Sequence, residues 1–458
     1  MRRCLFGCFR GERLEETRVS LSDACVRDAY SVLSDVVTGE HVDYEAASRA
    51  CNEILARLPD VNERAAFTMP DVDGDVAMLL RLQLGIAIRT DSTCKISPTP
   101  ALDQEAAAST SGLLDRMCSI ASRSGKGLVR DLHPGVDSDW EFDVARLNVD
   151  TNGRALSLLA THFIKSCGAV AKLAIHERKV AACMRAIEVG YRGNPYHNSV
   201  HAACVLQQTH LLVNCMGVDD PYVRLVAYVA AVVHDYDHVG LTNAYLVHTG
   251  HAIAVTHNDN SPMENHSLQA AFRVMASDGN DFLADLPPKR RRDARRDIIS
   301  LVMATDMTRH MDFHSRFCAA HATSSADRPR RDSMEPRMRD IQFALKCADL
   351  GHTFLPFDLH VRWVLLLEEE CFMQGDLERA RGMPVTPLFD RAHPGLTRSQ
   401  VGFFEIVVFP MLSVFSRAFP RSDRMLASAT SNAAHWYEQG RADGESSKRL
   451  PCLSDPAP

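Results

Sequence analysis

Apolar residues along this 458-residue chain repeat mainly at helical spacing. Residues 17–90 carry them three or four positions apart, as Val26 and Tyr30 illustrate, which predicts helices around an irregular middle. Residues 91–135 are rich in Ser, Thr, Gly and Pro, which is typical of a linker. From Trp140 onward the 3.6-residue period continues over long segments, without sustained alternation of period two. The pattern predicts an all-α protein, with a compact multi-helix domain and a mostly helical N-terminal extension.

The changes in composition divide the chain into five predicted parts. They are an N-terminal tail (1–16), a helical region of unknown role (17–94), a linker (95–135), one helical domain (136–445) and a C-terminal tail (446–458). A single domain of that length can bury a large hydrophobic core.

Four predicted helices of this domain combine an apolar stripe with a capping or stop signal. They are the segments from Pro221 into His234, from Pro262 through Phe272, from Ile298 through Thr305 and Asp306, and from Met338 to a stop at Gly351. Each brings polar or charged side chains to an otherwise apolar helix.

The charge balance bears on the binding partners of the protein, and the cysteines bear on its cellular compartment. Lys and Arg number 51 against 58 Asp and Glu, so the net charge of -7 offers no general attraction for nucleic acid. The 14 cysteines include no C-x-x-C pair, which favours reduced thiols in a cytoplasmic protein. No segment is predicted to cross a membrane.

The N-terminal residues leave several possibilities open. Cys4 and Cys8 lie among phenylalanines and arginines, a composition compatible with double acylation and peripheral membrane association, although a frayed terminus is the simpler explanation. Residues 1–130 are also compatible with autoinhibition or with a homodimer.

Histidines are concentrated in one part of the domain. Nine of the 20 lie between His197 and His266, and imidazole is a common metal ligand. The spacing of His197 and His201 predicts that both lie on one face of a helix. His234 and Asp235 follow a strongly apolar helix, where burial without partners would be costly. A metal site or a simple His–Asp hydrogen bond would satisfy them.

Asp349 completes a candidate ligand set. It shares a predicted helix with an apolar stripe, so it also needs a partner, whether a metal or a helix-end hydrogen bond. Two neutral imidazoles and two carboxylates suit Zn²⁺, with room for a second, harder ion such as Mg²⁺ or Mn²⁺. Such a pair suits phosphodiester hydrolysis, in which a bound water must lose a proton and growing phosphoryl charge must be neutralised. His197, if not a ligand, can protonate the leaving alkoxide.

Six motifs occur in order along the domain. They are Tyr196-His-Asn-Ser-Val-His201, Val233-His-Asp-Tyr-Asp-His238, Met263-Glu-Asn-His266, Ala304-Thr-Asp-Met307, Cys347-Ala-Asp349 and Ser399-Gln-Val-Gly-Phe403. Over about Trp140 to Trp436 the chain resembles the catalytic domain of class I 3′,5′-cyclic nucleotide phosphodiesterases, which are HD-type metallohydrolases. The resemblance implies that residues 136–445 hydrolyse cAMP, cGMP or both to the 5′-monophosphate, which terminates cyclic nucleotide signalling.

The resemblance also implies roles for particular residues. Zn²⁺ is expected to be bound by His201, His234, Asp235 and Asp349, with Asp235 bridging to Mg²⁺ or Mn²⁺. A metal-bridged hydroxide then attacks the phosphorus and His197 protonates O3′. Waters around the second metal are expected to be oriented by His238, Glu264 and Thr305, with Asp306 beside them. The substrate pocket is expected to contain Tyr196, His352, Leu367, Gln400 and Phe403, with Gln400 bonding the purine and Phe403 stacking on it.

Two positions depart from cAMP-selective relatives. His352 stands where those relatives have Asn, and His360 replaces a frequent Tyr. An imidazole donates or accepts according to its tautomer, so the sequence leaves the choice between cAMP and cGMP open.

Two other functions fit parts of the sequence. One is a His–Asp metallo-phosphohydrolase acting on linear nucleotides, against which Gln400 and Phe403 argue as a purine clamp. The other is a signalling or scaffold protein that binds cyclic nucleotide without turnover, against which the complete ligand set and His197 argue. Without the resemblance, Phe403 would be interpreted as core and Gln400 as an ordinary helix residue.

Overall fold

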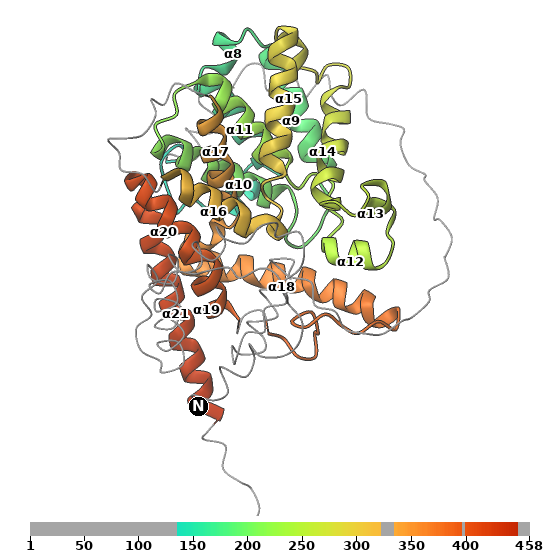
Figure 1. Cartoon of the computed structure of the whole chain (residues 1–458), viewed down its shortest axis with the longest axis vertical. Helices are drawn as coiled ribbons and strands as arrows, with labels where there is room; N and C mark the ends of the chain where they lie inside the picture. The colour runs from blue at the N-terminus through green and yellow to red at the C-terminus, as the bar shows by residue number, and fades with distance from the viewer. Residues whose placement is uncertain (1–134, 322–333, 396–398, 448–458) are drawn as a thin grey trace, which may run out of the picture. The chain divides into compact units, whose positions relative to one another are not determined.

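A computed structural model describes residues 135–321, 334–395 and 399–447, and within these ranges the chain forms helices and no strands (Figure 1). The predicted all-α class is confirmed. The predicted parts 1–16 and 17–94, almost all of the linker 95–135, and Cys4 and Cys8 lie outside the described residues.

The described residues form a succession of helices. The α-helices are α6 (Val144–Asp150), α7 (Ala155–Ser166), α8 (Ala169–Lys172), α9 (Glu177–Gly190), α10 (Ser199–Cys215), α11 (Pro221–Val233), α12 (Asn243–His248), α13 (Ala252–Thr256), α14 (Pro262–Met275), α15 (Pro288–Val302), α16 (His310–His321), α17 (Met334–Asp349), α18 (Phe357–Ala380), α19 (Gln400–Phe403), α20 (Phe409–Ala418) and α21 (Asp423–Ser447). The shorter turns are η2 (Leu283–Asp285), η3 (Met307–Arg309), η4 (Gly351–Phe354), the π-helical η5 (Phe404–Val408) and η6 (Pro420–Ser422).

Helices α10 and α11 form the centre of the core. Every residue from His201 to Val213 of α10 is buried, and α11 is buried over nearly its whole length. Both helices pack against each other and against α7 and α17 (Figure 1). A helix that is apolar on all sides is stable only when other helices surround it, which explains this central position. The predicted start of α11 is confirmed, because the Asp220 side chain accepts a hydrogen bond from the Tyr222 amide beside Pro221.

One predicted helix end is wrong, and another is confirmed near its predicted residue. Helix α15 ends at Val302, so Thr305 and Asp306 lie beyond it. The amide and hydroxyl of Thr305 both donate to the Val302 carbonyl, and Asp306 caps η3, which together close the helix. Helix α17 ends near Gly351 as predicted, but for another reason. A Cβ at Gly351 would lie 2.9 Å from Cγ of Gln208, so the glycine allows close packing on α10.

The C-terminal helices complete the wall below the bundle. In Figure 1, α18 runs across the lower side of the described helices, and α21 packs against its N-terminal part. The stretch Gln400–Ala418, which spans α19 to α20, is long and apolar enough by composition to cross a membrane. Because 61% of its apolar window is buried within the protein, it also has the character of a core helix.

Candidate metal centre

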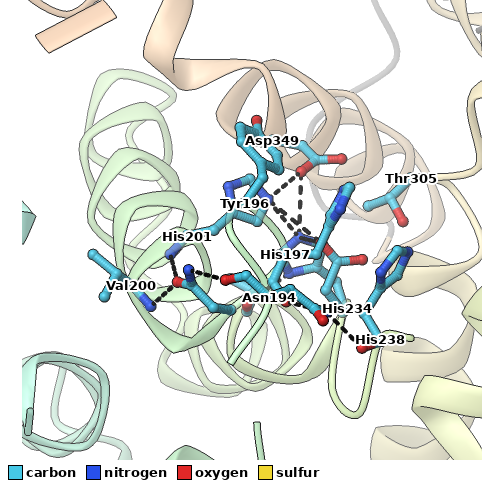
Figure 2. Close-up of polar contacts among 12 residues, drawn as sticks. Asn194, Tyr196, His197, Val200, His201, His234, His238, Thr305 and Asp349 are labelled. Carbon is cyan, nitrogen blue, oxygen red and sulfur yellow. Dashed lines mark hydrogen bonds and ion pairs between the residues drawn. The ribbon is translucent and has the colours of Figure 1, made fainter. Parts of the chain in front are cut away.

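Two histidines and two aspartates converge at one point of the helical core (Figure 2). Nε2 of His201 lies 3.1 Å from Oδ1 of Asp349 and 3.4 Å from Oδ2 of Asp235. Nε2 of His234 lies 3.0 Å from Oδ2 of Asp235 and 3.2 Å from Oδ1 of Asp349. One atom from each of the four residues therefore lies within 4.8 Å of the others, as a shared cation requires.

Helix ends position these four side chains. His201 is in the first turn of α10, His234 and Asp235 follow the last residue of α11, and Asp349 is the last residue of α17. Nδ1 of His234 lies 2.9 Å from the carbonyl oxygen of Ala231, to which it can only donate. Metal-binding histidines usually make such a hydrogen bond through the nitrogen that does not bind the metal. In the neutral ring it leaves the Nε2 lone pair directed into the cluster. The donor set therefore fits a divalent cation.

Opposite charges shift the pKa values of His234, Asp235 and Asp349. Although burial opposes it, the carboxylates of Asp235 and Asp349 hold the pKa of His234 well above its usual range. The pKa values of both carboxyl groups are correspondingly lowered, against burial, mainly by His234. A cation bound here would replace the proton on Nε2 of His234, so metal binding should release a proton.

His197 lies beside this group, but not on the predicted helix face. Helix α10 begins at Ser199, because the Asn198 side chain accepts hydrogen bonds from the amides of Val200 and His201 and caps it. His197 therefore precedes the helix, and the prediction that it shares a helical face with His201 is wrong. The two rings are nevertheless neighbours, with centroids 5.8 Å apart.

Glu370 is a partner of His197 that the sequence analysis missed. Its Oε1 lies 2.5 Å from Nδ1 of His197, and its Oε2 accepts hydrogen bonds from the amides of Tyr196 and His197. Burial lowers the pKa of His197, but the charges of Glu370 and Asp235 outweigh it and raise the pKa to about 9. The pKa of Glu370 falls to about 2, because His197 outweighs the effect of burial. One signal was present: Glu370 follows Trp363 by two helical turns, on the buried face of α18.

His238 and Asn194 close the other side of His197. The ring of His238 stacks on that of His197 with centroids 4.0 Å apart. Nδ1 of His238 accepts a hydrogen bond from the amide of Gly240, so the proton of the neutral ring is on Nε2. Asn194, which the sequence analysis also missed, donates to the carbonyl oxygens of His197 and His238 (Figure 2).

The predicted second-metal residues Glu264, Thr305 and Asp306 lie next to the cluster and form what we call its wall. Thr305 faces the cluster in Figure 2. Burial, and then the charge of Asp306, raise the pKa of Glu264 to about 7, and Asn243 donates to its Oε2. The Asp306 carboxylate already accepts hydrogen bonds from the hydroxyls of Ser261 and Thr308. A cavity of about 810 Å³ lies on the far side, lined by Asn243, Ser261 and Asp306 among others but by none of the four cluster residues.

The predicted base-pocket residues come from α18, α19, η4 and the loop before α10. Gln400 and Phe403 are the first and last residues of α19 and are both buried, while Leu367 is partly buried on α18. Tyr196 lies nearer to the cluster, with its ring centroid 4.7 Å from that of His201.

A chain of hydrogen bonds fixes the tautomers of His352 and His360. The Trp436 indole, which can only donate, lies 2.9 Å from Nε2 of His360, and the two Nδ1 atoms of the histidines are 3.0 Å apart. Burial lowers the pKa of His360 to about 4 and that of His352 further, so both rings are neutral. His360 must therefore carry its proton on Nδ1 and donate it to His352, whose own proton is on Nε2. His352 then offers a donor between His360 and Tyr196, whose ring centroid is 6.0 Å away.

Sequence comparisons relate the chain to one family. A sequence model described as 3′5′-cyclic nucleotide phosphodiesterase matches residues 196–429. The 3′,5′-cyclic-AMP phosphodiesterase, isoform F, of Drosophila melanogaster is 33% identical over 279 residues, which are 59% of this chain and 42% of that protein. Dual specificity calcium/calmodulin-dependent 3′,5′-cyclic nucleotide phosphodiesterase 1C of Mus musculus is 34% identical over 284 residues, 60% of this chain and 39% of that protein. The chain therefore spans less than half the length of these curated relatives.

A solved structure has the same arrangement of helices. The phosphodiesterase domain of the RhoPDE fusion protein from the choanoflagellate Salpingoeca rosetta superposes with a TM-score of 0.63 at 26% identity. The superposition covers 69% of this chain and 99% of that domain.

Proposed function

Because this chain belongs to the 3′,5′-cyclic nucleotide phosphodiesterase family, we propose that it hydrolyses the cyclic phosphodiester of cAMP and cGMP to the 5′-monophosphate. The observation that carries the proposal is the combination of four converging ligand side chains with a separate, carboxylate-held imidazole. A protein that only binds nucleotide has no need of a second titrating group aimed at the same point.

The metal ions of this proposal are Zn²⁺ and Mg²⁺ or Mn²⁺. Zn²⁺ would be held by His201, His234, Asp235 and Asp349, and the harder ion by a carboxylate of this set together with water. Divalent cations bound there would lower the pKa of a bound water and would neutralise negative charge on the phosphoryl oxygens. His238, Glu264 and Thr305 would orient waters around the second ion.

His197 is the proposed general acid. Its raised pKa of about 9 keeps the ring protonated at neutral pH, and Glu370 holds the Nδ1 proton. The proton on Nε2 is therefore the one available to O3′ as the P–O3′ bond breaks and the alkoxide leaves. Glu370 is in this proposal the residue that orients the ring and stabilises its charge.

The purine would be bound by donors and acceptors that suit both bases. His352 offers an Nε2–H donor, and adenine and guanine both carry the N7 acceptor. The Gln400 amide carries both a donor and an acceptor, so it can bond the 6-amino group of adenine or the 6-oxo group of guanine. We therefore propose hydrolysis of both nucleotides, with Phe403, Leu367 and Tyr196 contributing the apolar walls.

Substitution of one ligand tests the proposal. Asp349→Ala should lower kcat/KM for both nucleotides by about 10³-fold or more, because removal of a ligand carboxylate disables the cation site. Asp340→Ala is the matched control, since Asp340 lies on the same helix and pairs with His321 instead. Full activity of Asp349→Ala, turnover of linear nucleotides only, or nucleotide binding without turnover in Mg²⁺ or Mn²⁺ would each contradict the proposal.

A further inference from the structure

A lysine is buried behind the wall of the proposed second-metal position. Lys346 lies one helical turn before Asp349 on α17 and is only 2% exposed. Its Nζ lies 3.5 Å from the carbonyl oxygen of Asp306 and 3.7 Å from Sδ of Met307, above the Phe313 ring. A side chain of this type is rarely buried without an opposite charge in contact.

No carboxylate oxygen pairs directly with this ammonium group among the described residues. The carboxylate of Asp306 accepts from Ser261 and Thr308 instead, so Lys346 contacts only the backbone of that residue. Burial lowers the pKa of Lys346 to about 8, opposed chiefly by the charges of Asp349 and Asp306. At neutral pH the group therefore stays mainly protonated.

The charges around Lys346 all belong to the proposed metal site or its wall. Asp349, Asp306 and Glu264 lie on the metal side. Lys346 also acts on His310 of α16, whose pKa is lowered to about 3 by burial and then by Lys346, so this ring is neutral. The positive charge thus acts on the acidic wall from close range, within a medium that screens charge poorly.

We propose that Lys346 weakens the hold of this site on its second divalent cation, by adding a fixed positive charge behind the wall of Glu264 and Asp306. The inference rests on the proposed function, which supplies the second cation. A like charge near a cation site lowers its affinity. The charge also offsets part of the repulsion between neighbouring carboxylates before any cation binds. The site would therefore be organised in advance and would exchange its second cation readily.

Three substitutions at Lys346 separate charge from hydrogen bonding. Lys346→Met removes both the charge and the bond to Asp306, and a buried ion replaced by an apolar side chain of similar volume commonly leaves a fold intact. Lys346→Gln keeps a donor without the charge, and Lys346→Arg keeps the charge. Lys179→Met removes a positive charge from a partly buried pair with Asp285 on a different helix and serves as the control.

The measurement is calorimetric titration of Mg²⁺ into the full-length, zinc-loaded protein, with melting temperatures in chelator to check folding. Lys346→Met and Lys346→Gln should both bind Mg²⁺ about tenfold more tightly than the wild type, while Lys346→Arg and Lys179→Met should not. Unchanged or weaker binding by both neutral variants would overturn the inference alone. Weaker binding by Lys346→Met with normal binding by Lys346→Gln would show that the hydrogen bond to Asp306 matters and the charge does not. That result would also overturn the inference. Wild-type protein that binds no second ion would overturn the proposed function and this inference together.

Discussion

At the scale of single residues, the activity proposed for this chain depends on how Glu370 holds His197. The two side chains are 173 positions apart and meet at 2.5 Å in a pocket where Glu370 also receives two backbone amides. Such a carboxylate is difficult to replace, because it fixes the orientation of the ring and keeps its proton at neutral pH.

Substitution of Glu370 should therefore change the pH dependence of hydrolysis. Glu370→Gln removes the charge that, with Asp235, raises the pKa of His197 to about 9. The general acid acts only below its pKa, so we expect the alkaline limb of the kcat profile to move down from about pH 9 toward the ordinary imidazole value of about 6.5, with kcat at pH 8 lowered by up to about 30-fold. Profiles of kcat against pH for cAMP and cGMP measure this shift.

The neighbouring residue provides the control for that experiment. Glu369→Gln alters an exposed carboxylate that pairs with Arg391, so its profile should match the wild type. A Glu370→Gln profile with an unmoved alkaline limb would show that Glu370 does not govern the protonation of His197.

Residue chemistry also explains which site residues could be predicted from sequence. His201, His234, Asp235 and Asp349 stand out because histidine and aspartate on apolar helices need partners. Glu370 and Asn194 are polar residues in segments that contain other polar residues, so they do not stand out in the sequence. Their hydrogen-bond partners are determined by tertiary packing. Their identification therefore required the positions of α18 and of the loop before α10.

At the scale of helices, the N-terminus of α10 sets the geometry of His197 and His201. Asn198 adopts an extended conformation, accepts from two amides of the first turn and donates to the carbonyls of Asn194 and Pro195. The cap thus ends the loop that carries one proposed catalytic group and begins the helix that carries a ligand.

Removal of this cap should lower the stability of the protein. Asn198→Ala should cost about 1 kcal/mol of unfolding free energy, because two amides lose their acceptor, whereas Asn198→Asp should restore most of it. Chemical denaturation of the metal-free protein measures both. Equal stability of the Ala and wild-type proteins would show that solvent replaces the cap without cost.

The tautomer chain that links η4, α18 and α21 supports a second prediction. His360→Phe would leave the Trp436 N–H and Nδ1 of His352 without their partner, so the proton of His352 would no longer be fixed on Nε2. One hydrogen bond to the purine should then be weakened, raising KM for cAMP and cGMP by about tenfold while kcat changes little. Steady-state kinetics with both nucleotides separate these terms.

A matched substitution lies on the adjacent helix. His435→Phe keeps the stacking of that ring on Phe357, whose centroid is 4.5 Å away, and should leave KM unchanged. Unchanged KM in His360→Phe would mean that the fixed tautomer has no part in binding the base.

Helix interiors were easier to predict than helix ends. The apolar stripes of α11, α14 and α17 and the Asp220 cap are local signals, and the structure confirms these helices. The start of α10 after His197 and the end of α15 before Thr305 depend on competition between side-chain capping and helical continuation, which periodicity does not register.

At the scale of the whole molecule, the net charge of -7 does not attract an anionic substrate, and the site itself adds a concentration of carboxylates to the core. Cations are therefore needed both for substrate affinity and for the compatibility of those carboxylates with a folded core. The helices that supply them, α10, α11 and α17, are also the centre of the hydrophobic core. A change in cation occupancy should thus change the stability of the entire domain.

Removal of the metal should accordingly lower the melting temperature. A cation present at 100 times its dissociation constant stabilises the native state by about 2.7 kcal/mol, which for a domain of this size corresponds to about 5 °C. Calorimetric scans of the full chain with Zn²⁺ and Mg²⁺ and then with chelator measure the difference. In Asp349→Ala the chelator should have almost no effect, because the ligand set of His201, His234 and Asp235 is incomplete. An equal loss of stability in that variant would place the stabilising cation elsewhere in the molecule and would separate metal binding from the proposed catalytic centre.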